Sequence, residues 1–435
     1  MITGLKRVAA KARSYPKLRF TSLAHHITPA SLCKNLKKVP HNTSPGVDGL
    51  TAEETKKGFK QWLEKALTSV HRQCYKASPV KRVWIPKPGK KEKRPLGVPC
   101  INDRVLQRSV ADVLNAIYEQ DFLACSMGGR PRVGAHHALA TFHEILSDRR
   151  VNWVLEADLK NFFGSLDHGW LLRFVEHRVG DPRILNLIRR WLKAGVMESG
   201  ELQACEEGTP QGGPISVVLS NLYLHYVLDL WFERKVRPRL KGKAWLIRYI
   251  DDFVVCFQYC SDAQRLMEVL PKRLEKFALK LEPDKTRLIR FGRSAGRKGK
   301  RPETIYFLGF THYCARSRKG NFMVGRKTEK SRLRRSITNL KELLRRIRHD
   351  LLHKQVTVIN RRLRGHYAYY GLGGNYKSLN KLYQFVDRYW YRMLNSRSQK
   401  SKIIWEKYQK LKQLMPLQKP KISLPFTAMK SMAVL

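Results

Sequence analysis

The sequence predicts an α/β body followed by an all-helical domain. From residue 42 to about residue 313, helix-like and strand-like patterns of apolar residues alternate between glycine- and proline-containing turns, which is typical of an α/β body. After Gly325 the apolar residues recur every three or four positions, as they do on a long amphipathic helix. With 435 residues the chain is too long for one ordinary core, so we expect two or three packed units.

The charge balance points to a polyanionic partner. The chain has 85 Lys and Arg against 35 Asp and Glu, a formal net charge of +50, and such an excess opposes a compact fold unless a polyanion neutralises part of it. Nucleic acid is the expected partner, because neutralising phosphates releases counterions and gives sequence-independent affinity. An anionic membrane surface is the alternative. A spanning helix is not expected, since no stretch approaches about 18 uninterrupted apolar residues.

The cysteines and the N-terminal segment bear on location. The eight cysteines are scattered, without a CxxC pair or histidines at zinc spacing, so we expect reduced thiols in a cytoplasmic protein. No acidic residue precedes Asp48, and six lysines and arginines are interleaved with small and apolar residues before Phe20. A basic arm that grips nucleic acid has this composition, and so does an organellar transit peptide. The arm is the favoured interpretation.

A pair of adjacent carboxylates is the first chemical signal. Asp251 and Asp252 follow the apolar run 245–247 and precede the apolar run 253–257, a pattern that predicts two strands joined by a tight turn. Two like charges side by side are costly unless a cation lies between them. Taken alone, the pair is equally compatible with a hairpin turn whose acids are solvated.

Asp158 supplies a third carboxylate. It ends the apolar run 153–157, which predicts a strand, and Asp167 further along is placed to cap a helix that begins at His168. A carboxylate at a strand end that faces an Asp-Asp hairpin can hold two Mg²⁺ ions about 3.5–4 Å apart. Such a pair of ions activates a primer 3′-hydroxyl and stabilises a leaving pyrophosphate. The three aspartates therefore predict nucleotidyl transfer.

A glycine-rich loop lies between these carboxylates in the sequence. Residues 208–214 have the sequence GTPQGGP and open into the apolar, helical stretch 215–233. The backbone of such a loop and the N-terminus of the helix after it can lie against a nucleotide and a template base. As a helix-entry loop the segment is unremarkable, but its position between Asp158 and the sequence YIDD is specific.

The C-terminal region combines apolar stripes with basic faces. The spacing from Leu333 to Leu351 predicts one long amphipathic helix, and residues 356–396 predict a second helical segment rich in aromatic residues. Basic residues with few acids fill the rest of the first helix, which favours a phosphate-facing surface over a merely solvated one. The residues after Met415 hold several prolines and predict an extended tail. The arginines expected to contact nucleic acid are Arg334, Arg345, Arg348, Arg361 and Arg364.

These motifs stand in the order found in one family, and the chain resembles reverse transcriptases of the group II intron type over nearly its whole length. Eight ordered blocks and a helical motif after them carry the resemblance. They are residues 42–50 (NTSPGVDGL), 83–99 (VWIPKPGKKEKRPLGVP), 126–139 (SMGGRPRVGAHHAL), 158–168, 208–221, 248–257, 281–287 (LEPDKTR), 306–310 (YFLGF) and 361–370 (RRLRGHYAYY).

The resemblance implies a right-hand polymerase fold of the α/β (α+β) class. Fingers and a palm with a mixed, partly antiparallel sheet are followed by an all-helical thumb, also called domain X. The expected domains are a basic N-terminal extension (1–41), the fingers and palm (42–313), the thumb (314–410) and a C-terminal tail (411–435).

The resemblance also implies roles for single residues. Asp158, Leu159, Asp251 and Asp252 are expected to hold the two Mg²⁺ ions, for which Mn²⁺ can substitute. Lys285 is expected either to protonate the leaving pyrophosphate or simply to contact phosphate. The residues that would bind the incoming dNTP are Lys87, Arg94, Phe163, Gln211 and Gly212, with Phe163 excluding a 2′-hydroxyl. The primer grip would be Leu308, Gly309 and Phe310.

Two departures from the family pattern affect the expected task. Ile250 replaces the alanine that usually precedes the two aspartates, and this residue is shared with free-standing relatives, one clade of which is associated with DNA repair synthesis and end joining. Ile250 is therefore expected to tune the active site. No zinc-bearing HNH endonuclease domain follows the thumb, so cleavage of a target strand by that route is not expected.

Two functions from different classes follow. The favoured one is an RNA-directed, and also DNA-directed, DNA polymerase with a host role in repair through microhomology end joining, in the bacterial cytoplasm close to the nucleoid. Its partners would be DNA/DNA or RNA/DNA primer–templates and dNTPs, without a membrane. The alternative is a maturase, a binding protein that stabilises structured group II intron RNA for splicing and retrohoming. A basic protein of the membrane surface leaves all eight blocks unexplained.

Overall fold

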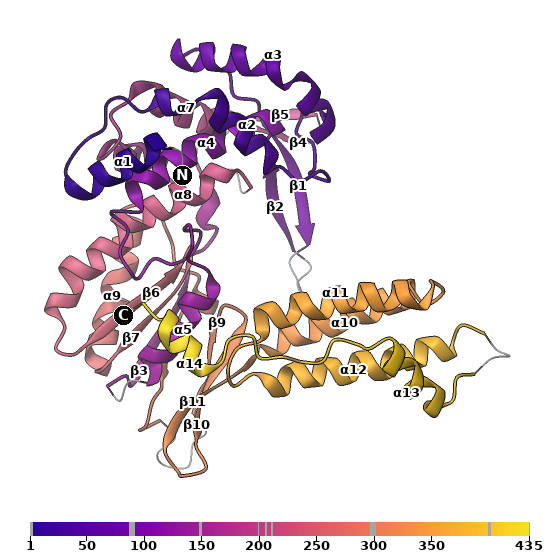
Figure 1. The fold of residues 1–435 in the computed structure, drawn as a ribbon. Coiled ribbons are helices and arrows are strands. Elements are labelled where there is room, and N and C mark those ends of the chain that lie inside the picture. The colour runs from indigo at the N-terminus through magenta and orange to yellow at the C-terminus, as the bar shows by residue number, and fades with distance from the viewer. Residues whose placement is uncertain are drawn as a thin grey trace. The chain divides into compact units, whose positions relative to one another are not determined.

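The computed structural model describes residues 3–86, 92–147, 150–198, 200–204, 207–209, 212–295, 302–398 and 402–434 (Figure 1). The chain forms two compact units. The first unit contains residues 1–134, 157–255 and 259–287, and the second contains residues 135–156, 256–258 and 288–435. Helices and strands alternate along the predicted body, so the predicted α/β class is confirmed.

The first unit is built around a buried helix, α4 (Ile101–Tyr118), against which α1 (Thr3–Ser14), α2 (Pro29–Lys37) and α8 (Pro214–Leu224) pack. Local sequence signals start several of these helices. Thr28 and Thr51 each form a capping box, at the start of α2 and of α3 (Ala52–His71). The remaining helices of the unit are α6 (His168–Glu176), α7 (Pro182–Lys193) and α9 (Cys260–Glu275).

Helix α8 does not end as a simple α-helix. Its axis continues through two π-helical turns, η3 (His225–Asp229) and η4 (Phe232–Val236), and a short 3₁₀ turn, η5 (Arg237–Arg239). By length and composition, residues 214–239 are apolar enough to cross a membrane, but 78% of their apolar stretch is buried inside the protein. A core helix meets the same criterion.

Two four-stranded sheets carry the sequence motifs. One has the order β2-β1-β4-β5, in which β1 (Val80–Pro86) pairs antiparallel with β2 (Lys93–Val98) and parallel with β4 (Val196–Glu198), and β5 (Glu201–Gln203) forms the edge. The other has the order β6-β7-β3-β8, from β6 (Ala244–Tyr249), β7 (Asp252–Phe257), β3 (Trp153–Asp158) and β8 (Arg287–Arg290). The predicted strand before Asp158 and the predicted hairpin at Asp251 are both present.

The second unit joins a small sheet to a helical bundle. The sheet has the order β11-β10-β9, from β9 (Ile305–Phe307), β10 (Phe310–Arg316) and β11 (Phe322–Thr328), and α5 (Ala135–Ser147) packs against β11. Helices α10 (Lys330–Arg346), α11 (Leu352–Tyr370) and α12 (Tyr376–Asn395) lie side by side (Figure 1), followed by α13 (Trp405–Leu414) and α14 (Phe426–Met432).

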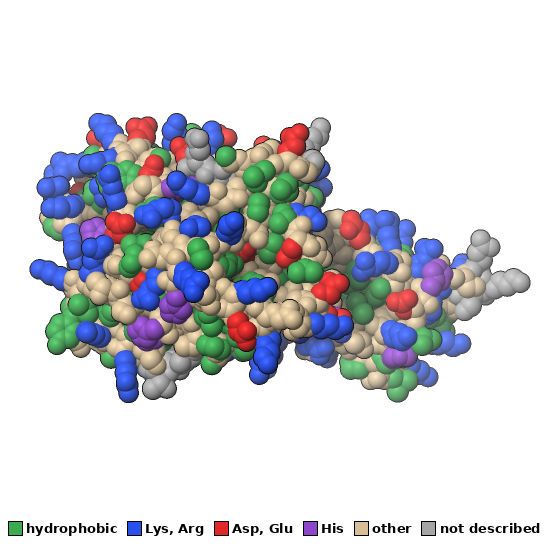
Figure 2. Space-filling view, turned by 90° about the horizontal axis from the view of Figure 1, so that it is seen from above, with side chains coloured by type: hydrophobic (Ala, Val, Ile, Leu, Met, Phe, Trp, Pro, Cys, Tyr) green, Lys and Arg blue, Asp and Glu red, His purple; other side chains and the backbone are tan. Residues whose placement is uncertain are grey.

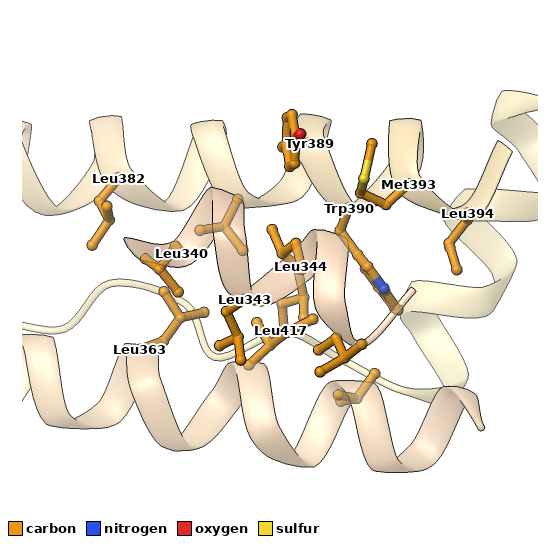
Figure 3. Packing of buried hydrophobic residues seen from close by; sticks show 14 of the residues in the cluster. Leu340, Leu343, Leu344, Leu363, Leu382, Tyr389, Trp390, Met393, Leu394 and Leu417 are labelled. Carbon is orange, nitrogen blue, oxygen red and sulfur yellow. The ribbon is translucent and has the colours of Figure 1, made fainter. Parts of the chain in front are cut away.

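The bundle core consists of the predicted leucine stripe and the aromatic helix after it. Leu340 and Leu344 of α10 lie against Leu382 and Trp390 of α12, with Leu363 of α11 completing the layer (Figure 3). The Trp390 indole N–H donates to Gln355 Oε1 at 2.9 Å, so the one polar atom of this buried ring is satisfied.

Several boundaries differ from the sequence prediction. The helix expected to run to Leu351 ends at Arg346, and Leu351 is the N-cap of the next helix with a side chain 59% exposed. The second predicted segment is two helices, because the glycine-rich turn 371–374 interrupts it and Gly374 has φ +87°.

Both the N-terminal extension and the C-terminal tail contain helices that the sequence analysis did not predict. The N-terminal extension contains α1, whose Leu5, Val8 and Ala12 are buried although basic residues separate them. The expected extended tail contains α14, which buries Met429 and packs on α5. Apolar spacing was present in both segments, but their high charge and proline content hid it. The basic loop expected at 294–301 lies mostly outside the described residues.

Lysine and arginine side chains are spread over much of the face seen in Figure 2, with fewer acidic side chains between them. Part of the net charge of +50 therefore lies on this face. Such a surface suits a polyanionic partner.

Candidate active site

The segment that follows β3 is fastened to a second stretch of the first unit. Leu159 forms a β-bridge with Leu281, the Lys160 N–H donates to the Lys280 carbonyl at 2.8 Å, and the Glu282 N–H donates to the Asp158 carbonyl at 2.8 Å. These bonds place the end of β3 next to the short helix η6 (Pro283–Lys285). Residues more than a hundred positions apart in sequence thus meet at Asp158.

Lys285 pairs with Asp158. Its Nζ donates to Asp158 Oδ2, and the two side chains are 57% and 22% exposed. Burial acts to lower the pKa of the Lys285 ammonium, but the hydrogen bond and the charge of Asp158 outweigh it, so the pKa of Lys285 is raised. The lysine therefore carries a proton at neutral pH, directly beside the carboxylate.

Asp251 lies in the two-residue turn that joins β6 to β7. Burial raises the pKa of the Asp251 carboxyl above its ordinary value, and the charge of Asp158 raises it further. A backbone hydrogen bond and the charges of Arg94 and Lys285 act in the opposite direction. Asp158, Arg94 and Lys285 are thus close enough to shift the pKa of Asp251. These three residues and Asp251 come from four separate sequence motifs.

The turn itself has a strained backbone. Ile250, its first central residue, has φ +60°. This is the position at which a two-residue hairpin of the II′ kind normally has glycine, and for a β-branched residue a positive φ costs on the order of 1–3 kcal/mol. Strain of this size persists only where the surroundings impose it.

The chemistry of the donors fits a hard divalent cation. Asp158, Asp251 and Asp252 offer carboxylate oxygens, which are the ligands that Mg²⁺ prefers. The pKa of the Asp251 carboxyl is raised mainly by burial, and the charge of Asp158 adds to the rise. Among the described residues, however, no three His, Cys, Asp or Glu side chains are already grouped as a complete metal site. The Lys285 ammonium is the cation that pairs with Asp158 in this structure.

The Phe163 loop and the glycine-rich loop are packed on each other. The Thr209 N–H donates to the Phe163 carbonyl and the Gly208 N–H donates to the Leu166 carbonyl, both at 2.8 Å. Gly208 has φ +82°, and a Cβ there would lie 2.9 Å from the Phe163 carbonyl oxygen and from Gly164 Cα. Only glycine allows the two loops to approach so closely.

Gly212 connects the same loop to β2. It has φ +126°, and a Cβ on it would come within 2.6 Å of the Gly97 carbonyl oxygen. The strand that contacts Gly212 also carries Arg94. Of the predicted dNTP-binding residues, the structure thus brings Arg94, Phe163 and Gly212 into one region of the first unit, while Lys87 and Gln211 lie outside the described residues.

The predicted primer grip forms a tight turn in the second unit. Leu308 and Gly309 have φ +47° and +77° between the paired residues Phe307 and Phe310, as in a type I′ hairpin. The Tyr369 hydroxyl donates to the Leu308 carbonyl at 2.9 Å, which anchors the turn to the helical bundle.

The predicted nucleic-acid-binding arginines lie on the bundle and differ in their partners. Arg334, Arg361 and Arg364 are exposed. Arg345 donates from Nε to the Tyr389 hydroxyl at 2.9 Å, and Arg348 donates to His349 Nε2 at 2.9 Å. Arg345 therefore contributes to the packing of the bundle as well as to its charge.

Sequence reasoning missed one buried ion pair next to the hairpin, between Arg248 and Asp229. Both side chains are fully buried, and Arg248 stands in an otherwise apolar strand while Asp229 stands in a largely apolar helix. A charged residue inside each of two apolar runs was the available signal, since buried charges are almost always paired.

The mixed α/β fold is consistent with a polymerase, and comparison with known proteins identifies the family. Residues 85–312, about half of the chain, match the family described as reverse transcriptase (RNA-dependent DNA polymerase), and the chain belongs to this family. Within it the chain is a group II intron-like reverse transcriptase, as the resemblance of its motifs implied.

Several known proteins are similar in sequence to this chain. Protein YkfC of Escherichia coli is 29% identical over 79% of this chain and 96% of its own length. The group II intron-encoded protein LtrA of Lactococcus lactis is 27% identical over 75% of this chain and 66% of its own length. A protein in the cob intron of Schizosaccharomyces pombe is 33% identical over 39% of this chain.

Replacing Asp251 with Asn is expected to abolish primer extension and to stabilise the protein in metal-free buffer. The pKa of Asp251 in the folded state lies above its unfolded value, so the native protein binds more protons between the two values and its stability falls as the pH rises through that interval. Asparagine removes this cost. The melting temperature of the variant should exceed that of the parent at pH 7, and the difference should shrink as the pH is lowered towards about 4.

The exposed Asp284 provides a matched control, since Asp284→Asn removes a nearby carboxylate that is in contact with water. This variant should alter neither extension nor the pH dependence of melting. Parental extension rates in Asp251→Asn would remove Asp251 from the catalytic site.

Proposed function

We propose that the chain extends a primer with deoxynucleotides by two-metal nucleotidyl transfer at Asp158, Asp251 and Asp252. The convergence of Asp158, Asp251, Lys285 and Arg94 in one part of the first unit carries the proposal. Two Mg²⁺ ions held by the carboxylates, with the Leu159 carbonyl as a further ligand, would activate the 3′-hydroxyl and offset charge on the leaving group. Mn²⁺ is expected to substitute.

The residues of the chain supply the remaining parts of the reaction. The primer 3′-oxygen forms a bond to the α-phosphorus while the bond from that phosphorus to pyrophosphate breaks, and the hydroxyl proton passes to solvent water. Arg94 offsets negative charge on the triphosphate, as a cation placed where charge develops should do. Lys285, protonated beside Asp158, is positioned to give its proton to pyrophosphate or to bind a phosphate oxygen.

The biological task that we propose is DNA repair synthesis with end joining on short microhomologies. Ile250 supports it, because the chain shares this residue with the free-standing relatives that its sequence resembles. The Ile250 side chain lies against the loop of Gly128 and Gly129, where a Cβ built on Gly128 would be 2.8 Å from Ile250 Cγ1. Its influence on a primer end would therefore pass through the backbone of the turn.

A second candidate is a maturase that stabilises intron RNA. The names of two relatives favour it: LtrA is a group II intron-encoded protein, and an Arabidopsis thaliana relative, 23% identical over 41% of this chain, is a nuclear intron maturase. A splicing assay with a group II intron RNA separates the two tasks. Splicing that depends on the protein and survives in Asp251→Asn would establish the maturase role.

Phe163→Ala is expected to admit ribonucleotides. Phe163 is half-buried, and its ring packs edge-on against Phe162 with centroids 5.3 Å apart, so its position is fixed. Removing the ring should open space for a 2′-hydroxyl. The measurement is the ratio of kcat/KM for ribo- and deoxynucleotides opposite one template base, with the buried neighbour Phe162→Leu as a control for packing. An unchanged ratio would mean that another residue excludes the hydroxyl.

Salt dependence tests the basic surface of the bundle. Arg361→Gln together with Arg364→Gln should flatten the log–log dependence of primer–template affinity on salt, by about one unit for each phosphate that the variant no longer neutralises. Arg345→Gln is the matched control, because this arginine bonds Tyr389 and should lower the melting temperature as well. Affinity that drops in the Arg361/Arg364 variant with an unchanged slope would show that these residues support folding instead.

Ile250→Ala tests the proposed task. The variant is expected to copy a long, fully paired RNA template at least as well as the parent, and to join DNA ends through short microhomologies less efficiently. Both activities are measured on one preparation, so that misfolding, which lowers both, is recognised. A proportional change in the two activities would show that Ile250 only packs the turn, and would contradict the repair proposal.

A further inference from the structure

A fully buried guanidinium lies directly against the catalytic turn. All five N–H groups of Arg248 have acceptors: two go to the Asp229 carboxylate at 2.8 and 2.6 Å, one to Asn221 Oδ1 at 2.9 Å, one to Ser126 Oγ at 2.6 Å and one to the Ile250 carbonyl at 3.0 Å. A guanidinium has five donors in a fixed plane, so this network uses the complete capacity of the side chain.

The bond to Ile250 connects the network to the strained part of the turn. Ile250 has φ +60°, which a β-branched side chain disfavours. The bond from Arg248 fixes the orientation of the peptide group between Ile250 and Asp251. The orientation of this peptide determines where the chain continues into the two aspartates.

A second contact supports the turn from the same network. The segment before Gly128 pairs with β6, since the Met127 N–H donates to the Arg248 carbonyl and the Arg248 N–H donates to the Cys125 carbonyl, both at 2.8 Å. Asn221 Nδ2 donates to the Gly128 carbonyl at 2.7 Å. A Cβ on Gly128 would lie 2.4 Å from the Ile250 nitrogen, so glycine there lets the backbone of one segment support the other.

The π-helical turn explains how one helix supplies both the carboxylate of Asp229 and the amide of Asn221 to Arg248. Residues on the same face of an α-helix two turns apart are separated by about seven positions, whereas Asn221 and Asp229 are eight apart and both contact Arg248. The π turn His225–Asp229 follows Asn221 and ends at Asp229. Because a π turn takes up one extra residue, it brings Asp229 onto the face that already carries Asn221.

We propose that Arg248, held by Asp229 at the π turn, is a positioning residue that keeps Ile250 in its left-handed conformation and thereby aims Asp251 and Asp252. The inference rests on the proposed catalytic role of these two aspartates. It predicts that Arg248 affects the rate of nucleotide addition through the backbone of residue 250, and has little influence on how tightly primer–template binds.

A double-mutant cycle tests the proposal. Arg248→Lys keeps the charge but has only three donors on one atom, so it cannot hold Asp229 and the Ile250 carbonyl together. Ile250→Gly removes the strain, because glycine adopts positive φ freely. Single-nucleotide addition is measured at saturating dNTP on preformed primer–template for the parent, both single variants and the double variant.

The expected outcome is a kcat lowered about tenfold or more by Arg248→Lys in the parental background, with primer–template Kd changed less than about twofold, and a several-fold smaller loss when residue 250 is glycine. A loss of equal size in both backgrounds, or an unchanged kcat, would overturn the proposal. If Arg248→Lys does not fold, Asp229→Glu takes its place, since it keeps the charge while displacing the guanidinium, and the same two outcomes decide.

Arg178→Lys is the matched control for loss of a buried arginine. Arg178 pairs with Asp121 at 2.5 Å and donates to several backbone carbonyls of the N-terminal segment, among them Leu18 at 3.0 Å. Its replacement should lower the melting temperature and leave kcat unchanged. Asp251→Asn, measured alongside, tests the catalytic assignment separately: activity there removes the assignment, whereas additivity in the cycle removes only the role of Arg248.

Discussion

The partial burial of the Asp251 carboxylate close to Asp158, at the end of β3, is the constraint on which this part of the first unit depends. Asp251 is half-buried, and its pKa is raised first by this burial and further by the charge of Asp158. Lys285 and Arg94 offset part of this cost, and Arg248 fixes the turn while its own charge is neutralised by Asp229. The three cations come from three different elements, η6, β2 and β6, and the fold must bring all three to the end of β3 before the carboxylates can coexist.

The glycines of the loop at 208–213 allow the segments that surround this site to pack closely. A sequence such as PQGG suggests backbone lying against a nucleotide, and the structure adds that the backbone also lies against backbone. Gly208 contacts the Phe163 loop, and Gly212 contacts the Gly97 carbonyl in β2. Any side chain at either position would push apart the strand that carries Arg94 and the loop that carries Phe163. Packing inside the protein therefore requires these glycines, whether or not they also contact a substrate.

Local patterns were enough to predict the elements that carry the site. Alternation and apolar runs predicted β3 and the β6–β7 hairpin, and Asp167 caps α6 as expected, because its side chain accepts from the Trp170 N–H at 2.7 Å. Only the family resemblance placed Lys285 in the same site as Asp158, because 127 positions of sequence separate the two residues. The Arg248–Asp229 pair was missed because its register depends on a π turn, which apolar spacing does not reveal. The end of α10 was missed because Leu351 continues the apolar spacing although its side chain faces water.

The last helix of the chain has a consequence for how the protein is made. Helix α14 packs on α5, and the Val434 N–H donates to Thr141 Oγ1 at 2.9 Å across 293 positions of sequence. During synthesis α5 leaves the ribosome long before α14 exists, so the part of α5 that α14 covers stays exposed to water until residues 426–432 have emerged. The chain also passes between the two units at five points, after residues 134, 156, 255, 258 and 287. Neither unit can therefore be completed from one continuous stretch of nascent chain, and contacts of such long range are slow to form and leave the partly folded chain open to aggregation.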